Sequence, residues 1–202
     1  MEYDKIVYGF HGCDESVRRK ILSGEQWRPS VNTYDWLGSG IYFWENDERR
    51  AYEWAKSEAE RNGRIIKPAV VGAKINLGRC LDATTLEGVE MLRKGYKFLK
   101  QYTTDAGLAM PKNSNIKNDS DWKMLFLDCA VIQTVHKANE NEPFETVRGA
   151  FIEGKKVYPG AGFKDLSHIQ VCVINEKIFL RYYKLFSNHK ILFSKPTKSL
   201  LY

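Results

Sequence analysis

One segment of the chain changes abruptly from strand-like to helix-like patterning, and it constrains the fold more than any other. In Gly38-Ser-Gly-Ile-Tyr-Phe-Trp44, two glycines precede four consecutive apolar or aromatic residues, which is typical of a buried strand entered through a turn. Asn46 is expected to cap a following helix, with Asp47 and Glu48 in the first turn, where carboxylates favour the positive end of the helix dipole. Apolar residues then recur at helical spacing: Tyr52, Ala55 and Ala59. Such a strand and helix can form one wall of a cleft.

The same order of strand and helix occurs upstream. Residues 3–10 alternate in part between apolar and polar positions and are predicted to form a strand. Asp14 is placed to cap a short helix that Gly24 ends. No periodicity is visible from Glu25 to Trp36, and an irregular loop of this length inside a domain is often a functional lid.

The rest of the chain predicts further strands and two helices. The first helix, from Thr84 to Tyr102, is expected to open with a capping box of Thr84 and Glu87, and the second to span Trp122 to Lys137. Strands are expected over 65–77, 146–152, 169–174 and 178–186. Strands at both ends with helices between them predict an α+β fold. A GxGxxG motif and a P-loop lysine are absent from the sequence, which argues against a Rossmann domain or an NTPase.

Length and composition narrow the class of protein. A chain of 202 residues suits one domain with a substantial core. Four cysteines without a CxxC pair, and an N-terminus without an apolar leader, predict a reduced, cytoplasmic protein with no metal site and no membrane segment. The net charge of +6 favours anionic partners, either a nucleotide or a nucleic acid, and the basic segment 177–198 is a candidate surface for contacting a nucleic-acid backbone.

Taken together, these residues resemble a known family. His11-Gly12 at the end of a first strand, followed by Gly38-Ser-Gly-Ile-Tyr-Phe43 and a helix containing Tyr52, is similar to the catalytic domain of the poly(ADP-ribose) polymerase-like, diphtheria-toxin-type ADP-ribosyltransferases, the His-Tyr-Glu class. The resemblance covers residues 6–80 and returns at about 145–186. It implies a split antiparallel β-sheet within a single domain of residues 1–202, in which residues 84–138 are a helical insertion.

The resemblance also implies a binding site for NAD, which these enzymes use as a substrate. The backbone of Gly12 would hold the nicotinamide carboxamide, because a residue without a Cβ lets a ligand approach closely. His11 would contact a hydroxyl of the adenosine ribose, and Tyr42 and Tyr52 would stack on the nicotinamide ring. Arg28, in the irregular loop, would pair with the pyrophosphate. The remaining residues that the resemblance brings to the cofactor are Cys13, Ser39 and Phe43.

The sequence departs from the family at its third element, a glutamate on a late strand. Gln170 aligns with that position, and strand alternation puts Gln170 on one face with His168 and Cys172. A glutamine can hydrogen-bond a ribose hydroxyl but cannot act as a base. This favours transfer of a single ADP-ribose over chain elongation. It is also compatible with a second reading, in which the protein is a catalytically inactive relative of the family. Glu153 would either supply the carboxylate that activates the acceptor or be a surface residue of a strand. The predicted catalytic residues are His11, Tyr42, Gln170 and Glu153.

The predicted function is therefore NAD-dependent mono-ADP-ribosylation of a macromolecule. The positive charge favours a nucleic acid, RNA or DNA, over a protein as the acceptor. The lack of regulatory domains resembles the toxins and phage-defence effectors of this group, for which an antitoxin protein would be a partner. Two other classes stay open: an inactive protein that binds NAD or ADP-ribose, which Gln170 favours, and a basic nucleic-acid-binding protein whose motifs match by accident. The RNA 2′-phosphotransferases, which share the fold and use NAD, fit the Gly-Ile-Tyr-Phe run less well.

Overall fold

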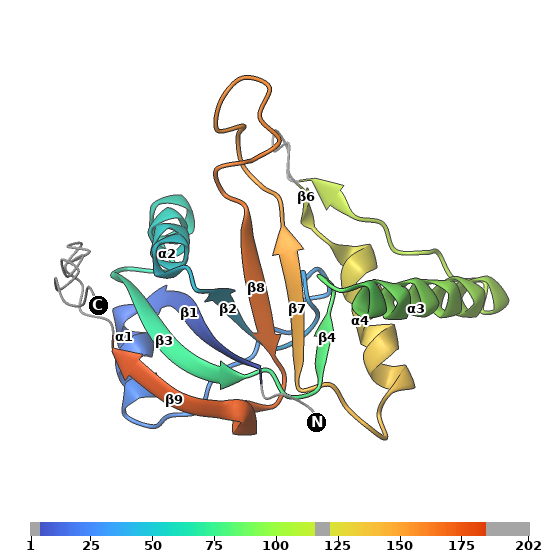
Figure 1. The fold of residues 1–202 in the computed structure, drawn as a ribbon, viewed down its shortest axis with the longest axis horizontal. Coiled ribbons are helices and arrows are strands. Elements are labelled where there is room, and N and C mark those ends of the chain that lie inside the picture. Colours follow the sequence, from blue (N-terminus) through green and yellow to red (C-terminus); the bar gives the residue numbers. More distant parts are fainter. Residues whose placement is uncertain (1–4, 116–121, 185–202) are drawn as a thin grey trace, which may run out of the picture.

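A seven-stranded sheet organises the computed structural model, which describes residues 5–115 and 122–184 (Figure 1). The strand order is β4-β7-β8-β2-β1-β3-β9, and neighbours are antiparallel except for the parallel pair β4 and β7. The bounds are β1 Ile6–Asp14, β2 Ile41–Glu45, β3 Pro68–Asn76, β4 Cys80–Asp82, β7 Thr146–Phe151, β8 His168–Val173 and β9 Phe179–Lys184. The short strands β5 (Ser114–Asn115) and β6 (Trp122–Met124) pair with each other. This mixture of a mostly antiparallel sheet with helices confirms the predicted α+β class.

Helices cover both faces of the sheet. Their bounds are α1 Glu15–Leu22, α2 Glu48–Asn62, α3 Leu86–Asp105 and α4 Phe126–Ala138, with a 3-10 turn at Glu176–Ile178. On one face, Ile21 of α1 and the loop residue Trp27 pack with the apolar side chains of β1, β2, β3 and β8. On the other face, Ala51 of α2 packs against Trp44, and Ile132 of α4 packs against β4, β7 and β8. No helix in the described ranges is both long and apolar enough to span a membrane.

The first strand is longer than its alternating pattern predicts. It continues past Phe10 to Asp14, so that His11-Gly12 lies within the strand and not at its end. The reason is that β3 pairs with β1 along this whole length, from Asn76 opposite Ile6 to Pro68 opposite Asp14. Within this pairing, His11 lies opposite Val71 and Gly12 lies opposite Val70. The pair that carries the resemblance is therefore held by backbone hydrogen bonds to β3.

The irregular loop before β2 is held against the domain at two points. The Trp27 side chain is buried in the core, and Ser30 and Gly40 exchange two backbone hydrogen bonds of 2.8 and 3.0 Å. Arg28, between these two anchors, is exposed. The predicted lid is thus a loop whose two halves are tied to the core and to the entrance of β2.

The capping predictions were right at one helix and wrong at two. Asp14 caps α1 and accepts a hydrogen bond from the Ser16 backbone N–H, as expected. Helix α2 is capped by Asp47 and not by Asn46, because Asn46 turns the chain in the left-handed region, with φ 55°. Helix α3 is capped by Thr85, whose hydroxyl accepts from the Gly88 N–H.

The predicted capping box fails because Thr84 has another partner. Its hydroxyl and its backbone N–H both donate to Asp82 Oδ1, at 2.6 and 3.0 Å. The second predicted helix also starts later than expected, at Phe126, since residues 122–124 form β6. Both helices between residues 84 and 138 are present, and most of the basic segment 177–198 lies outside the described residues.

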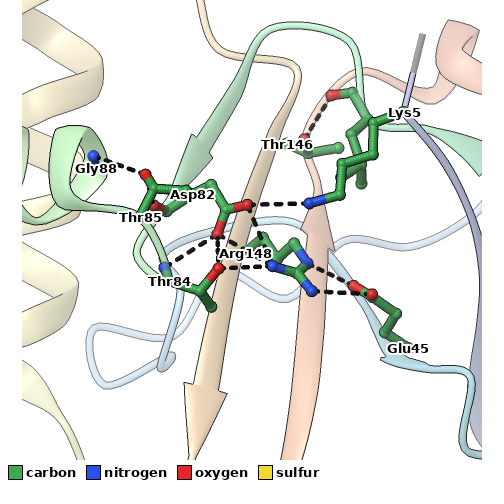
Figure 2. A network of polar contacts seen from close by, with 9 residues as sticks. Lys5, Glu45, Asp82, Thr84, Thr85, Gly88, Thr146 and Arg148 are labelled. Carbon is green, nitrogen blue, oxygen red and sulfur yellow. Dashed lines mark hydrogen bonds and ion pairs between the residues drawn. The ribbon is translucent and has the colours of Figure 1, made fainter. Parts of the chain in front are cut away.

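A buried ion-pair network links side chains of the three strands β2, β4 and β7 (Figure 2). Arg148 of β7 donates two hydrogen bonds to Glu45 of β2, of 2.6 and 3.0 Å. Its guanidinium also lies 3.2 Å from Asp82 of β4 and donates to the Thr84 hydroxyl at 2.7 Å. Lys5 reaches Asp82 at 3.4 Å. One guanidinium therefore holds two carboxylates from different strands.

Candidate functional site

The two motif strands, β1 and β2, separate from each other beside His11. They are paired at Gly9–Glu45 and Phe10–Trp44, and beyond this point the His11 Nδ1–H donates to the Tyr42 carbonyl oxygen at 2.8 Å. Because successive strand residues point to opposite faces, the His11 side chain lies on the face of α1 and the Tyr42 side chain on the face of α2 and α4. The His11 side chain thus spans the place where the strands part.

Burial fixes the protonation of His11. Its ring contacts Trp27 edge-on at a centroid distance of 5.1 Å and Phe43 at 5.7 Å. Burial lowers the pKa of His11, and its hydrogen bond to the Tyr42 carbonyl only partly opposes this. The ring is therefore neutral at pH 7, with the proton on Nδ1 and Nε2 left as an acceptor.

Tyr42 is anchored at its hydroxyl. The phenol donates to the Gly38 carbonyl at 2.6 Å and accepts from the Leu37 N–H at 2.8 Å, and burial raises its pKa. Its ring packs with the cluster beneath α4, whereas Tyr52 packs with the cluster beneath α2. The two tyrosines predicted to sandwich a nicotinamide ring thus belong to neighbouring clusters on the same face of the sheet.

Gly12 has a packing role that the sequence did not reveal. A Cβ at this position would overlap the Ala51 carbonyl oxygen of α2 and touch the Trp54 ring. The absence of a side chain therefore lets α2 lie directly on β1. We expect Gly12→Ala to lower the free energy of unfolding by about 1–3 kcal/mol, the usual cost of overpacking. Urea denaturation would measure this, with Gly107→Ala as the comparison for a glycine whose Cβ meets no atom within 4 Å.

Gly107 has a positive φ of 64°, so its alanine variant carries a backbone cost but no steric overlap. Equal losses in the two variants would show that contact with α2 is not what requires glycine at position 12.

The late-strand residues lie in a cluster of rings next to β2. His168 and Gln170 of β8 are buried on the same face of the sheet as Trp44, which pairs with Gln170, so the predicted alternation is confirmed. The His168 ring stacks on Phe151 at 5.6 Å and lies 6.4 Å from Trp36 and 6.2 Å from Trp44. We call Trp36, Trp44, Phe151 and His168 the aromatic cluster.

A buried ion pair adjoins the aromatic cluster. Glu153 is 5% exposed, and its carboxylate lies 3.7 Å both from an Arg50 guanidinium nitrogen and from His168 Nδ1. Burial lowers the pKa of His168. The hydrogen bond that its Nδ1–H donates to the Leu166 carbonyl, at 2.7 Å, acts in the opposite direction but is the smaller effect. The Arg50 guanidinium in turn lies 5.8 Å from the centre of the Trp44 ring. Glu153 is therefore an interior carboxylate and not a surface residue of a strand.

The aromatic cluster and the adjoining Arg50 contain polar atoms without partners. Within the described residues, the buried nitrogens His168 Nε2, Trp44 Nε1 and Arg50 Nε have no hydrogen-bond acceptor or donor opposite them. Buried polar groups are nearly always paired in folded proteins, and those that are not often mark a site for a ligand or water. Three such atoms beside a buried carboxylate make this the strongest candidate site of the described chain.

The other predicted cofactor residues are scattered. Cys13 and Phe43 have core side chains on the face of α1, and burial raises the pKa of the Cys13 thiol to about 12. Ser39 accepts a hydrogen bond from Gln133 of α4 at 3.0 Å. Arg28 is exposed on its loop. The structure thus brings Glu153 against His168, which shares one face of β8 with Gln170. It leaves Arg28 and Ser39 outside that cluster and places His11, Cys13 and Phe43 on the opposite face of the sheet.

Arg50 and the two tryptophans were not predicted from the sequence. Arg50 is one of several charged residues in the first turns of α2, and neither Trp36 nor Trp44 belongs to a motif with a known role. Their only sequence signal is proximity to the Gly-Ile-Tyr-Phe run. Among the residues that the structure describes, no group of three or more His, Cys, Asp or Glu side chains is arranged to hold a metal ion.

Comparison with known proteins identifies a relative of unassigned function. No family model matches the chain, and no solved structure matches it. An uncharacterized protein, MJ0359, of Methanocaldococcus jannaschii is 27% identical over 207 residues, which cover 92% of this chain and 90% of that protein. The match therefore spans nearly the whole length of both chains.

Proposed function

We propose that the protein is an NAD-dependent mono-ADP-ribosyltransferase that modifies a macromolecule, with a nucleic acid favoured over a protein as the acceptor. The observation that carries the proposal is the sheet order. Strands β1, β2 and β8 are neighbours, so the segments bearing His11-Gly12, Tyr42 and Gln170 adjoin one another although they are far apart in the sequence. Gly12, Tyr42 and Gln170 face α2 and α4, and the His11 side chain lies on the other face of the sheet. The parting of β1 and β2 after Phe10 and Trp44 supports the split-sheet fold of this family.

The residues present are compatible with a ligand such as NAD. Its ribose hydroxyls, carboxamide and phosphates offer acceptors for Trp44 Nε1 and Arg50 Nε, and a ribose hydroxyl can donate to His168 Nε2. All three atoms are buried without partners in the described chain. Gln170, on the same face of β8, can bond a ribose hydroxyl through its amide. Tyr42 would present its ring, since its hydroxyl is already engaged by Leu37 and Gly38.

The proposed reaction needs a group that accepts a proton. NAD supplies an ADP-ribosyl group: the bond from ribose C1′ to nicotinamide breaks, and its electron pair leaves with the nicotinamide. An acceptor oxygen or nitrogen forms the new bond to C1′ and loses a proton. Glu153, the buried carboxylate 3.7 Å from His168, is suited to take that proton, while Arg50, also 3.7 Å away, balances its charge.

An inactive binder of NAD or ADP-ribose is the second candidate. Gln170 favours it, because a glutamine in place of the family's glutamate cannot carry charge. The two functions separate in one experiment. The protein is incubated with NAD labelled in the adenylate, together with single-stranded RNA, DNA or cell lysate. Transfer predicts label on one acceptor and release of nicotinamide; a binder protects NAD and releases none. If neither label transfer nor NAD binding is observed, both candidates fail.

We also propose a toxin or defence role, in which an antitoxin protein would be a partner. Expression of the wild-type chain should then arrest growth of the host. A variant without transferase activity should not, and growth arrest that persists in such a variant would contradict this role.

Tyr42→Phe separates the ring of Tyr42 from its hydroxyl. The variant keeps the stacking surface but leaves the Leu37 N–H and the Gly38 carbonyl without their partner. We expect a loss of about 1–3 kcal/mol in the free energy of unfolding and transfer within about tenfold of wild type, since stacking persists. Tyr158→Phe, on an exposed side chain, is the control. A complete loss of transfer by folded Tyr42→Phe would show that the hydroxyl, and not the ring, serves the reaction.

A further inference from the structure

Residues 152–167 connect β7 to β8 as a hairpin that projects beyond the sheet (Figure 1), and we call them the β7–β8 hairpin. Its two sides pair at Lys156 and Lys164, and the Val157 N–H donates to the Phe163 carbonyl at 3.2 Å. The turn at its tip is closed by a backbone hydrogen bond of 3.0 Å and contains a glycine with a positive φ of 81°. The hairpin is therefore a hydrogen-bonded structure with two defined faces.

Large apolar side chains are exposed along this hairpin. Single exposed apolar residues are common on protein surfaces, whereas a group of them usually marks a surface that binds a partner. The exposed fractions are 68% for Ile152, 50% for Val157, 57% for Tyr158, 73% for Phe163 and 39% for Leu166. Because all five belong to one short element, they form such a group.

The two faces of the hairpin carry different side chains. Lys156 and Lys164 lie opposite each other, so both project from one face. Val157 and Phe163 are the next positions toward the tip, so they project from the other face. The hairpin is thus amphipathic, with a lysine pair on one face and apolar side chains on the other.

The hairpin has an excess of positive charge. Residues 154–167 contain three lysines and one acidic residue, Asp165, which gives a net charge of 3 − 1 = +2. Asp165 lies opposite Lys155, and its carboxylate accepts the Lys155 backbone N–H at 2.7 Å. At the base of the hairpin, Glu153 is paired with Arg50 at 3.7 Å. Both acidic side chains are therefore engaged within the protein.

We infer that the β7–β8 hairpin docks on an anionic lipid surface. Amphipathic elements bind there with their apolar face at the boundary of headgroups and acyl chains and their basic residues among the anionic headgroups. Val157 and Phe163 supply the apolar face, and Lys156 and Lys164 supply the charge. The long stem of a lysine lets its ammonium reach the headgroups from an apolar environment. Such a contact needs no helix that spans the bilayer.

Two other kinds of partner fit the hairpin less well. A protein that covered Val157 and Phe163 would leave Lys156 and Lys164 in water, where like charges opposite each other only cost stability. A nucleic-acid strand stacked on Phe163 would lie on the face away from the lysine pair, so its phosphates would not reach both ammonium groups. An anionic lipid surface satisfies both faces, because an element at the depth of the headgroups is surrounded by lipid.

The test measures co-sedimentation of the full chain with phosphatidylcholine vesicles that contain about one third phosphatidylserine. Replacing Val157 and Phe163 together with aspartate should weaken binding at least about tenfold, because the apolar contact is lost. The matched control, aspartate at Ile66 and Leu86, which are 89% and 87% exposed, should bind as wild type does. Equal losses in the two variants would overturn the inference.

The lysine pair is tested by charge and salt. Replacing Lys156 and Lys164 with glutamine should weaken binding about tenfold or more at low salt, and the loss should shrink as salt screens the surface. Glutamine at Lys97 and Lys137, which are exposed on α3 and α4, is the control. Equally tight binding to vesicles of phosphatidylcholine alone would contradict the inference, since the charge would then play no part.

A third measurement detects insertion while keeping an aromatic ring in place. The emission of Phe163→Trp should shift to shorter wavelength with the anionic vesicles, and that of Ile66→Trp should not. An unchanged emission of Phe163→Trp would overturn the inference, as would self-association or RNA binding through Phe163 by a chain that does not bind vesicles. The inference does not rest on the proposed transferase function. Vesicle binding without ADP-ribosyl transfer would support it and contradict that function, and transfer without vesicle binding would contradict the inference alone.

Discussion

Replacing Arg148 with methionine is expected to lower the free energy of unfolding by about 3–5 kcal/mol. The guanidinium is the shared partner of Glu45 and Asp82 (Figure 2), and the three side chains are only 10%, 9% and 13% exposed. Methionine fills a similar volume but removes the guanidinium from Glu45 and leaves Asp82 only one cationic contact, that of 3.4 Å with the half-exposed Lys5. The loss of stability comes mainly from the two carboxylates, because their cost of desolvation is no longer offset by the positive charge of Arg148.

Urea denaturation at pH 7 would measure this loss, with Arg61→Met as the control. Arg61 pairs with Glu58, but its side chain is 58% exposed, and we expect a change below about 1 kcal/mol. A loss as small as this in Arg148→Met would show that the network does not stabilise the fold.

The pH dependence gives a second check on the same variant. Burial alone would raise the pKa of Asp82, but hydrogen bonds from Thr84 and the charges of Arg148 and Lys5 together lower it below its usual value. A carboxylate whose folded pKa is depressed contributes stability above its unfolded pKa, near 4, and loses it as pH falls through the folded value. The difference between wild type and Arg148→Met should therefore shrink as the solution is acidified below about pH 4.

The sequence predicted the helices and most of the strands. The predicted N-caps were wrong where two neighbouring residues could both cap the helix. Asp14 was identified as a cap because a single suitable side chain precedes α1. At α2 and α3, two adjacent candidates compete, and a longer-range contact decides. Asn46 donates its backbone N–H to the Tyr8 carbonyl at 2.8 Å, and Thr84 bonds Asp82, so the following residue becomes the cap. Strand β4 was missed because three residues are too few to show alternation.

The candidate site was predicted in part. Strand alternation placed His168 and Gln170 on one face from the sequence alone, because that periodicity is local. The ion pair of Arg50 with Glu153 joins residues about a hundred positions apart and depends on how α2 lies over the sheet, which no local pattern encodes. The burial of Trp44 Nε1 without a hydrogen-bond partner depends on the same packing of α2 over the sheet. Residue types therefore suggested candidate groups, and only the fold showed that Glu153 lies against Arg50 and His168.

Glu153→Gln is expected to reduce ADP-ribosyl transfer by about 10²- to 10⁴-fold, the usual contribution of a positioned acid or base. Glutamine has the same shape, so it can keep contact with Arg50 and His168 but cannot take a proton from the acceptor. Binding of NAD, measured as thermal stabilisation by the ligand, should change little, because the carboxylate acts on the acceptor. Single-turnover transfer of labelled ADP-ribose would measure the loss in the chemical step.

Two comparisons distinguish this catalytic role from a structural one. Glu176→Gln, on an exposed side chain of the 3-10 turn, should transfer at the wild-type rate. Arg50→Gln removes the counter-ion of Glu153 and one proposed contact with NAD but keeps the carboxylate, so it should weaken NAD binding and lower stability, while transfer by the folded protein at saturating NAD falls less than in Glu153→Gln. If Glu153 only holds Arg50 and His168 in place, Glu153→Gln will unfold at a lower urea concentration, yet its folded fraction will transfer within a few fold of wild type. In that case the proton acceptor must lie elsewhere, and the buried carboxylate would be one more ion pair that supports α2 on the sheet.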